Sequence, residues 1–505
     1  MDIPSRPSRS SSLFPRARGA RLARADGTVV ATALAALAAA GLSGCAKDPA
    51  PKDALGGPGV TTPTPDAATP ASAPATVEGK LTVSLSGRTP IPPLALGLNY
   101  WSWTYGLTLA GSETAVTALG PKILRIGGHN NDTNSPSPFS EAEIDRAVAY
   151  ARTVGAEPIL QVPILADVNA VAPTADTAAQ MVRYTNTTKA YGVKYFSIGN
   201  EPDLYADPTQ SPPHLLSYTA DSYCQTAEAF VPAMRAVDPT IQIVGPDLSW
   251  KYQDGANDWL SPILANCGDL FDVVSIHRYP IAPTATSRTA AAADAAAFHA
   301  TIEAVRKKMA AAGQGAKPLA LTEANITWNG DPAMSTLEAS PGTLPAGLWV
   351  ADTLGTGLSE GLWTTAIWSI RESWTFGILT PDNVARPAYR AVALFSHHFG
   401  TTMLAVTSAP TGVHAYASRN AADDGTALVI VNWTDNVQKL SVAFDGATTS
   451  LVPPATVLVQ PMTMNAVQIP DDGGDVVVWP YGPSTWQSRA EPSPITSSRG
   501  GLPNL

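Results

Sequence analysis

The sequence predicts an α/β protein in which a closed (β/α)8 barrel is joined to an antiparallel β-sandwich. Three observations support this prediction. Short apolar runs alternate with amphipathic helical segments through the middle of the chain, and alternating polar and apolar residues return near its C-terminus. Polar groups follow directly after several of the apolar runs. At 505 residues, of which 45% are hydrophobic, the chain is long enough for two domains and non-globular ends.

Eight apolar runs are expected to be the barrel strands. They are residues 94–98, 122–126, 158–162, 195–198, 241–244, 272–276, 318–321 and 365–370. Helices are expected between and after them at residues 141–154, 174–191, 217–237, 289–312, 344–358 and 387–399. Parallel strands that are buried on both faces have continuous apolar runs, and eight strand–helix pairs close a barrel. We therefore place the barrel at residues 93–400.

The pattern after the barrel is typical of an antiparallel sandwich. Short alternating segments separated by turn residues occupy 413–418, 427–433, 439–444, 456–459 and 466–469. The early segment 81–86 also alternates, so we expect a strand within residues 79–92 to join the sandwich of residues 401–480. Residues 481–505 carry Pro, Ser and Gly without periodicity and are expected to be disordered.

The first 45 residues have the order of an export signal. An arginine-rich segment precedes an apolar run at residues 29–42, which is too short to span a bilayer, and the letters LSGC follow at 42–45. This ending resembles the bacterial lipoprotein signal, in which Cys45 would be lipidated; an ordinary signal peptide with a chance cysteine is the alternative. Residues 46–78 are rich in Pro, Ala and Thr and are expected to form a disordered tether. We therefore expect an exported, membrane-anchored lipoprotein, periplasmic or on the cell surface.

Charge and cysteine content exclude some function classes. The net charge of −10, without a basic stripe, argues against a nucleic-acid partner. Outside the signal only Cys224 and Cys267 remain, and they could be bridged or could be separate buried thiols. No CxxC or HExxH pattern is present, so we expect neither a dedicated metal site nor a cofactor.

Two glutamates follow barrel strands. The fourth run continues into Gly-Asn-Glu-Pro, in which Pro202 blocks further strand pairing and Glu201 is presented at the strand end. The seventh run is followed by Glu323. Barrel enzymes carry their active sites at this end, and two carboxylates about 5–5.5 Å apart define a retaining glycosidase. The alternative for Glu201 is that its side chain caps the following helix.

Further side chains at strand ends complete the predicted site. Arg125 and Tyr279 are expected to donate hydrogen bonds to Glu323. His277 is expected to line the floor, although a core histidine bonded to backbone is an open alternative. Asn200 is expected to bind a substrate hydroxyl. Tryptophans near strand ends can stack on sugars, but any one of them is as easily barrel packing.

Four motifs carry a family resemblance. LRIGG at 124–128, IGNEPDLY at 198–205, LTEAN at 321–325 and LFSHHFG at 394–400 resemble the clan A retaining glycoside hydrolases. Within that clan they are most similar to the family of bacterial β-glucuronidases and heparanase, glycoside hydrolase family 79, over residues from about 80 to about 470. The resemblance implies a TIM barrel with a terminal sandwich. It also implies that Glu201 is the acid/base, Glu323 the nucleophile and Asn200 a hydroxyl-binding amide.

One departure from that family concerns the uronate carboxylate. The family binds it with a Tyr and a Gly shortly after the nucleophile, and the matching positions here are Trp328 and Gly330. The loss of the phenol hydroxyl removes a donor, which puts uronate specificity in doubt but not the reaction type. The predicted substrate-binding residues are Asn99, Arg125, Asn200, His277, Tyr279, Trp328, Gly330 and Trp368.

These observations predict a retaining β-glycosidase, β-glucuronidase-like or heparanase-like, that acts on glycans or glycosides. Other specificities on the same machinery are the alternative: xylosidase, arabinofuranosidase or endo-glucanase. A non-catalytic, carbohydrate-binding surface lipoprotein is a remote third hypothesis, because a dead barrel need keep neither glutamate. The expected partners are a carbohydrate substrate and a membrane bound through the lipid anchor, and the expected oligomeric state is a monomer.

Overall fold

The computed structural model describes most of the chain after residue 72. The described residues are 73–498, except 102–108, 133–139, 167–171, 208–216, 256, 332–335, 373–374, 421, 447–452, 484 and 486–491. The predicted signal, Cys45 and most of the predicted tether lie outside the described residues. None of the helices in the described part of the chain has the length and hydropathy that a membrane span requires.

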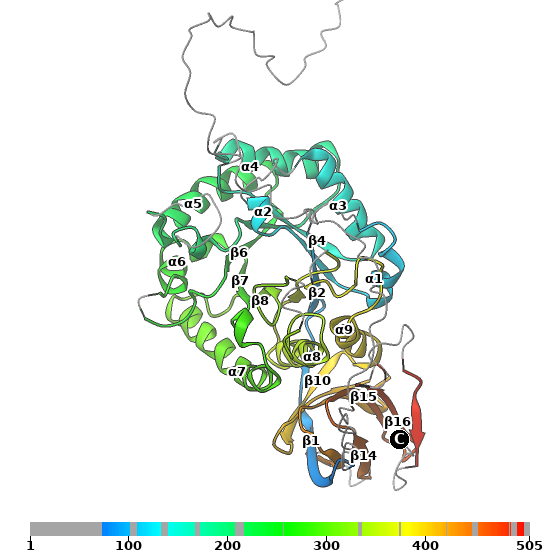
Figure 1. The fold of residues 1–505 in the computed structure, drawn as a ribbon. Helices are drawn as coiled ribbons and strands as arrows, with labels where there is room; N and C mark the ends of the chain where they lie inside the picture. The colour runs from blue at the N-terminus through cyan, green and yellow to red at the C-terminus, as the bar shows by residue number, and fades with distance from the viewer. Residues whose placement is uncertain are drawn as a thin grey trace, which may run out of the picture. The chain divides into compact units, whose positions relative to one another are not determined.

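Eight parallel strands close into a barrel, as the sequence predicts (Figure 1). In order they are β2 (Leu96–Tyr100), β3 (Ile123–Ile126), β4 (Glu157–Val162), β5 (Tyr195–Ile198), β6 (Gln242–Leu248), β7 (Val273–Arg278), β8 (Leu319–Ala324) and β9 (Thr365–Ile367). The last strand pairs with the first, which closes the cylinder. Several strands extend beyond their predicted C-terminal ends, and β6 continues by four residues to Leu248.

Helices surround the barrel (Figure 1). They are α1 (Glu113–Leu119), α2 (His129–Asp132), α3 (Glu141–Thr153), α4 (Ala175–Val182), α5 (Ala220–Val237), α6 (Leu260–Asn266), α7 (Arg288–Ala311), α8 (Leu344–Ser359) and α9 (Pro387–His398). The helix α3 begins at a capping box in which Ser140 and Glu143 bond each other's backbone N–H groups. The three shortest helices, α1, α2 and α6, were not predicted, because seven residues or fewer hold too few turns to show a helical period.

The other domain is one nine-stranded sheet. Its strand order is β14-β13-β1-β10-β11-β12-β15-β16-β17. The strands are β1 (Thr76–Pro90), β10 (Thr402–Ser408), β11 (Val413–Arg419), β12 (Gly425–Asn432), β13 (Val437–Asp445), β14 (Ala455–Val459), β15 (Thr463–Pro470), β16 (Val476–Tyr481) and β17 (Ile495–Ser497). Buried residues of β1, β13 and β14 share an apolar core with residues of β12, β15 and β16, so the sheet folds into two packed layers.

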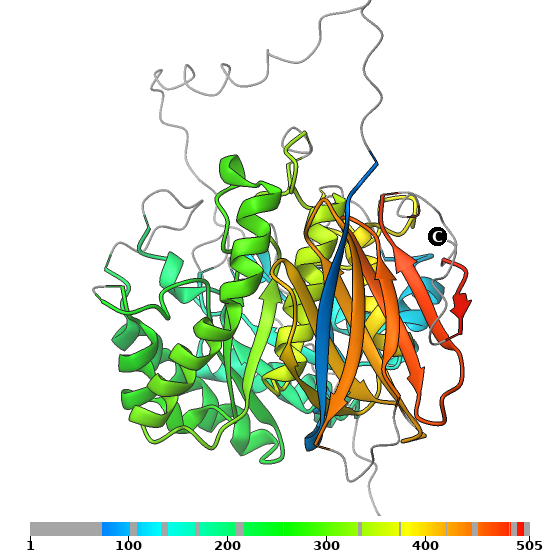
Figure 2. The same ribbon diagram turned by 90° about the horizontal axis from the view of Figure 1, so that it is seen from below.

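The N-terminal strand joins this sheet as predicted, and Figure 2 shows it in blue among the C-terminal strands. Two details differ from the prediction. The strand pairs antiparallel with β10 but parallel with β13, so the sheet is mixed. It also begins at Thr76, inside the stretch predicted to be tether, because pairing on both sides orders residues that have little apolar periodicity of their own.

The prediction of a disordered tail is wrong in part. The sheet continues through β16, which was not predicted, to the short strand β17. Three residues are too few to show alternation, and β17 is ordered by the backbone groups of β16. The strand β10 was also missed.

Apolar packing closes the bottom of the barrel. A cluster inside the barrel includes Ile123, Ile159, Val244 and Val273, which stand at or near the N-terminal ends of their strands. The polar residues of the predicted site follow at the opposite, C-terminal ends.

Outside the barrel, helix α8 packs on the nine-stranded sheet. Its buried Asp352 accepts hydrogen bonds from Tyr416 Oη and Trp433 Nε1 at 2.9 and 2.7 Å.

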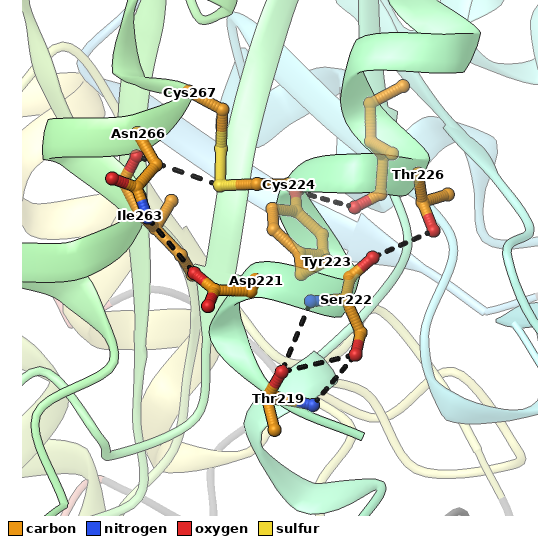
Figure 3. Close-up of a disulfide and its surroundings, with 10 residues drawn as sticks. Thr219, Asp221, Ser222, Tyr223, Cys224, Thr226, Ile263, Asn266 and Cys267 are labelled. Atoms are coloured by element: carbon orange, nitrogen blue, oxygen red, sulfur yellow. Dashed lines mark hydrogen bonds between the residues drawn. A yellow bond between two sulfur atoms is a disulfide. The ribbon is translucent and has the colours of Figure 1, made fainter. Parts of the chain in front are cut away.

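A disulfide joins two neighbouring helices of the barrel (Figure 3). Cys224 lies in α5 and Cys267 follows the end of α6, and both are buried. Beside the bridge, Tyr223 donates a hydrogen bond to the carbonyl of Ile198, the last residue of β5. The bridge therefore braces the two helices that follow β5 and β6, and it resolves the alternative that the sequence left open.

Candidate active site

Glu201 stands just after β5, at the barrel opening. Its φ of 49° is left-handed, and its backbone N–H donates to the carbonyl of Asp247. It occupies the N-cap position of the 3-10 turn that begins at Pro202, but its side chain makes no capping hydrogen bond. The helix-cap alternative is therefore wrong. The carboxylate instead lies 3.0 Å from His277 Nδ1, with 13% of the side chain exposed.

Glu323 is the fifth residue of β8, and both of its carboxylate oxygens have donors. Tyr279 donates its hydroxyl to Oε1 at 2.5 Å, and Arg125 Nη1 donates to Oε2 at 3.0 Å. His277 Nδ1 also lies 3.3 Å from Oε2. The structure thus places Arg125 and Tyr279 where the sequence analysis expected them.

The two glutamates meet at one point. Glu201, His277 and Glu323 each offer a side-chain atom within 4.8 Å of those of the other two. This separation fits the short spacing, about 5–5.5 Å, of a carboxylate pair that works by double displacement, and it is well below the roughly 6.5–9.5 Å of a pair that activates a water for direct attack. The supposition that residues far apart in the chain converge across the barrel opening is therefore correct.

The same three residues are the ligand types that a metal ion could use. A positive group is already present, because the Arg125 guanidinium forms an ion pair with Glu323. His277 Nδ1 faces both carboxylates, so the alternative of a core histidine bonded to backbone does not hold.

Arg125 organises the floor of the site. The side chain is fully buried, and its five N–H groups can all donate, which is the full donor capacity of a guanidinium. The acceptors are Glu323, Asp247, Asn200 and Asn99. Because a planar guanidinium directs these bonds in fixed directions, Arg125 holds residues of four strand ends in register.

Asp247, at the end of β6, is a site residue that the sequence analysis missed. It is fully buried and accepts hydrogen bonds from Arg125, from Thr322 Oγ1 at 2.7 Å and from Ser275 Oγ. Burial alone would raise its pKa, but Arg125, His277 and the two hydroxyl donors lower it below its usual value. The position at a strand end was the available signal, but it was lost because the fifth strand was predicted to end at residue 244.

Burial raises the pKa values of both glutamates, but the groups that oppose this rise differ between the two. Burial, followed by the charge of Asp203, raises the pKa of Glu201 to about 8. Burial also raises the pKa of Glu323, but His277, Arg125 and the Tyr279 hydroxyl all oppose that rise. Burial lowers the pKa of His277, so its imidazole is neutral at pH 7.

Two of the predicted substrate-binding amides differ in their contacts. Asn200 accepts from Arg125 Nη2 at 2.7 Å, and its buried Nδ2 has no hydrogen-bond partner among the described residues. Asn99 is enclosed: its Nδ2 donates to the carbonyls of Thr322 and Ala366. The free donor of Asn200 is suited to a ligand, whereas Asn99 supports Arg125 from below.

The predicted tryptophans also lie in different settings. Trp328 is 57% exposed on the loop after β8. Trp368 is buried against Trp101, and a Cβ on Gly128 would touch its ring. Gly330 packs on Phe376, with no room for a side chain. Trp328 is thus available to a ligand, while Trp368 is part of the barrel packing.

Three more buried carboxyl groups near the opening were missed. Asp132, which accepts the backbone N–H of Asn200, has a pKa raised by burial to about 7. Glu372, which accepts a hydrogen bond from Ser369 Oγ at 2.5 Å, also has a pKa raised by burial to about 7. Asp203 accepts three backbone N–H groups of the loop after β6. All lie within a few residues of a strand end, which was again the available signal.

Comparisons with known proteins give a likeness of fold. No family model and no curated protein matches the sequence. An α-L-arabinofuranosidase from Thermotoga maritima, solved with arabinose, is 17% identical over 78% of this chain and 100% of that chain, with a TM-score of 0.59. A family 44 xyloglucanase from Paenibacillus polymyxa is 15% identical over 78% and 99%, with a TM-score of 0.57.

A family 39 β-xylosidase from Caulobacter crescentus is 15% identical over 73% of this chain and 84% of that chain, with a TM-score of 0.52. At such low identity the likeness concerns the fold. The chain thus has an eight-stranded parallel barrel with an added β-sheet domain, an architecture that it shares with glycoside hydrolases of several families.

Proposed function

We propose that the protein is a retaining glycosidase in which Glu323 is the nucleophile and Glu201 the general acid/base. The observation that carries this proposal is the approach of the two carboxylates within 4.8 Å at the open end of the barrel, in unlike surroundings. The motif resemblance and the likeness of fold to glycoside hydrolases support it. A carbohydrate is the implied substrate.

In the first step Glu323 attacks the anomeric carbon. A new bond forms between a carboxylate oxygen and C1 while the bond from C1 to the glycosidic oxygen breaks. Glu201, which is protonated at pH 7 because its pKa is about 8, gives its proton to the departing oxygen. The products of this step are a glycosyl ester on Glu323 and the free alcohol of the leaving group.

In the second step Glu201 acts as a base. It takes a proton from a water molecule while the water oxygen attacks C1, and the ester bond to Glu323 breaks. The Glu323 carboxylate and the protonated Glu201 are regenerated, and the sugar leaves with its original anomeric configuration. The two substitutions at C1 cancel in stereochemistry, which is why a close carboxylate pair predicts retention.

The neighbouring side chains prepare these steps. Arg125 and Tyr279 donate to Glu323 and favour its ionised form, which is the form that attacks. The Nδ2 of Asn200, which has no hydrogen-bond partner among the described residues, would donate to a sugar hydroxyl, and such a contact strengthens as charge develops on the ring. The neutral imidazole of His277 bridges the pair without adding a charge between them.

For the substrate class, we propose β-glucuronidase-like or heparanase-like specificity as the first hypothesis, because the four motifs are most similar to that family. Xylosides, arabinofuranosides and glucans are the competing substrates, and Trp328 in place of the family's tyrosine favours them. A panel of p-nitrophenyl β-glucuronide, β-xyloside, β-glucoside and α-L-arabinofuranoside separates these cases by kcat/KM.

The reaction type is tested by trapping the glycosyl ester. 2-Deoxy-2-fluoro glycosyl fluorides of glucose, xylose and glucuronic acid slow the second step and accumulate the ester. We expect one of them to inactivate the protein and to add the mass of one fluoro sugar to the peptide that contains Glu323. A protein that none of them labels, and that hydrolyses no glycoside of the panel, would be a non-catalytic carbohydrate-binding barrel.

We also propose that the protein is exported and anchored through a lipid on Cys45. The support is the order of arginine-rich, apolar and LSGC segments. Metabolic labelling with a fatty acid should mark the full chain expressed in a bacterium, and Cys45→Ser should abolish the label. A labelled Cys45→Ser variant would contradict the proposal.

A further inference from the structure

An exposed tryptophan lies on a loop whose backbone is bonded to the turn that carries the proposed acid/base residue. Among the described residues, the large hydrophobic side chains that are exposed are Val77, Trp250 and Trp328. Trp250 is 39% exposed on the loop that follows β6, and Trp328 is on the loop that follows β8. An isolated exposed tryptophan is common on protein surfaces, so its meaning depends on what holds it and what it faces.

The loop that carries Trp250 is fastened to the loop that carries Glu201. Asp203, two residues after Glu201, is fully buried and accepts the backbone N–H groups of Ser249, Trp250 and Lys251 at 2.9, 3.1 and 3.0 Å. The Ser249 side chain is close enough to Glu201 to lower its pKa. The backbone of Trp250 is therefore fixed to the turn that carries the proposed acid.

The Trp250 ring is also supported from the side. Lys251 Nζ lies 5.6 Å from the centroid of the Trp250 ring and 5.2 Å from that of Trp259. Trp259 in turn stacks on Tyr218, which packs against Tyr205. A cation held between two indole rings restricts both of them, so the exposed ring is pre-organised for stacking.

The acid and the nucleophile contact different parts of the substrate. The acid must reach the glycosidic oxygen, so the leaving group lies on the Glu201 side of the broken bond. The transferred sugar lies against the nucleophile Glu323. Glu323 belongs to β8, and the loop that carries Trp328 follows this strand. Trp250 and Trp328 would therefore meet different parts of one substrate.

We propose that Trp250 is the stacking surface for the ring of the leaving group, a pyranose or an aryl ring linked to the sugar that is transferred to Glu323. This inference rests on the proposed function and adds to it a binding site for the aglycone. An indole face presents a flat apolar area to the C–H face of a pyranose, and the same surface receives an acceptor sugar when the ester is resolved.

The test follows how the trapped ester is released. The protein is labelled with whichever 2-deoxy-2-fluoro glycosyl fluoride inactivates it, excess reagent is removed, and recovery of activity is measured in buffer and with phenyl β-D-glucopyranoside or cellobiose as acceptor. We expect an acceptor to speed recovery of the unmodified protein. In Trp250→Ala the ratio of acceptor-dependent to water-dependent recovery should fall about tenfold, and Trp250→Phe should restore most of it.

Trp328→Ala is the matched control, since it removes the other exposed tryptophan of the opening. Its ratio should stay within about twofold of the unmodified protein, because the ratio reports the leaving-group side. An unchanged ratio in Trp250→Ala, an equal fall in both variants, or no acceleration by either acceptor in the unmodified protein would each overturn the Trp250 site. Failure of all reagents to label Glu323, together with no hydrolysis of any glycoside of the panel, would instead contradict the proposed function.

Discussion

The two glutamates at the barrel opening carry the same carboxyl group in unlike settings. Glu323 receives a hydrogen bond from a guanidinium and another from a phenol, and it lies beside the imidazole of His277. Glu201 is met by a neutral imidazole and lies near the charge of Asp203. Neighbouring groups therefore assign the two roles, since hydrogen bonds from a cation and a phenol suit a nucleophile, and burial beside another carboxylate suits an acid.

The largest effect is expected from Glu323→Ala, which removes the donor-rich carboxylate. Turnover of an activated aryl glycoside should fall on the order of 10⁴-fold or more, because no ester can form. Azide should restore part of the rate and give a glycosyl azide of inverted configuration, as read by NMR. Undiminished turnover in this variant would show that Glu323 is not the nucleophile.

Glu201→Ala should separate the two roles by leaving group. Substrates with poor leaving groups should lose about 10²- to 10⁴-fold in kcat/KM, because their departing oxygen needs a proton. A dinitrophenyl glycoside should lose far less in its first step, since dinitrophenolate leaves as the anion. The measurement is kcat/KM against the pKa of the leaving group, and an equal loss for every leaving group would contradict the role.

Arg125→Lys tests whether the guanidinium holds Glu323 in its ionised form. It keeps a positive charge but loses the planar fork that reaches four acceptors, so kcat/KM should fall about 10- to 100-fold. A weaker donor raises the pKa of the nucleophile, so the acidic limb of the pH profile should move to higher pH. Tyr279→Phe should move this limb in the same direction, and a limb that stays in place in both variants would argue against this stabilisation.

The pH profile tests the setting of Glu201. The acid must be protonated for the first step and its pKa is about 8, so kcat/KM should decline above about pH 8, nearly tenfold per unit. The decline should disappear in Glu201→Gln when a dinitrophenyl glycoside is the substrate. If the alkaline limb persists unchanged in that variant, another group controls it.

The smallest effect on catalysis is expected from the disulfide, which braces the Glu201 side of the barrel. The double variant Cys224→Ala, Cys267→Ala should lower the free energy of unfolding by about 2–4 kcal/mol, as measured by urea denaturation. Its kcat should change by less than about twofold, because the Tyr223 hydroxyl still donates to the carbonyl of Ile198 and the Asp247 carbonyl still accepts the backbone N–H of Glu201. A large loss of kcat would show that the bridge itself positions the acid.

Much of the architecture could be predicted because periodicity is local. The eight barrel strands and the longer helices lie close to their predicted ranges, since buried parallel strands and amphipathic helices mark themselves in the sequence. The strands β10, β16 and β17 and the parallel pairing of β1 with β13 could not be predicted in the same way. Their order depends on backbone bonds to segments far away in the chain, which no local pattern records.

The site residues also differ in whether a local sequence pattern could predict them. Glu201 and Glu323 could be predicted from the sequence because each follows an apolar run. Arg125 and Tyr279 could be predicted because they lie near the ends of other strands. Asp247, Asp203 and the Ser249–Trp250 loop were not, because their importance comes from contacts across β5, β6 and β8. Asn99 has the position of a substrate contact, yet its amide bonds to backbone carbonyls.

The parallel barrel and the two glutamates at its strand ends could be predicted from the amino-acid sequence alone, because strand burial and residue type are properties of short segments. The distance between the two carboxylates, and the donors that surround Glu323, could be seen in the folded structure but not in the sequence. Distance and acidity depend on groups brought together from six strands, and electrostatic interactions act through space rather than along the chain.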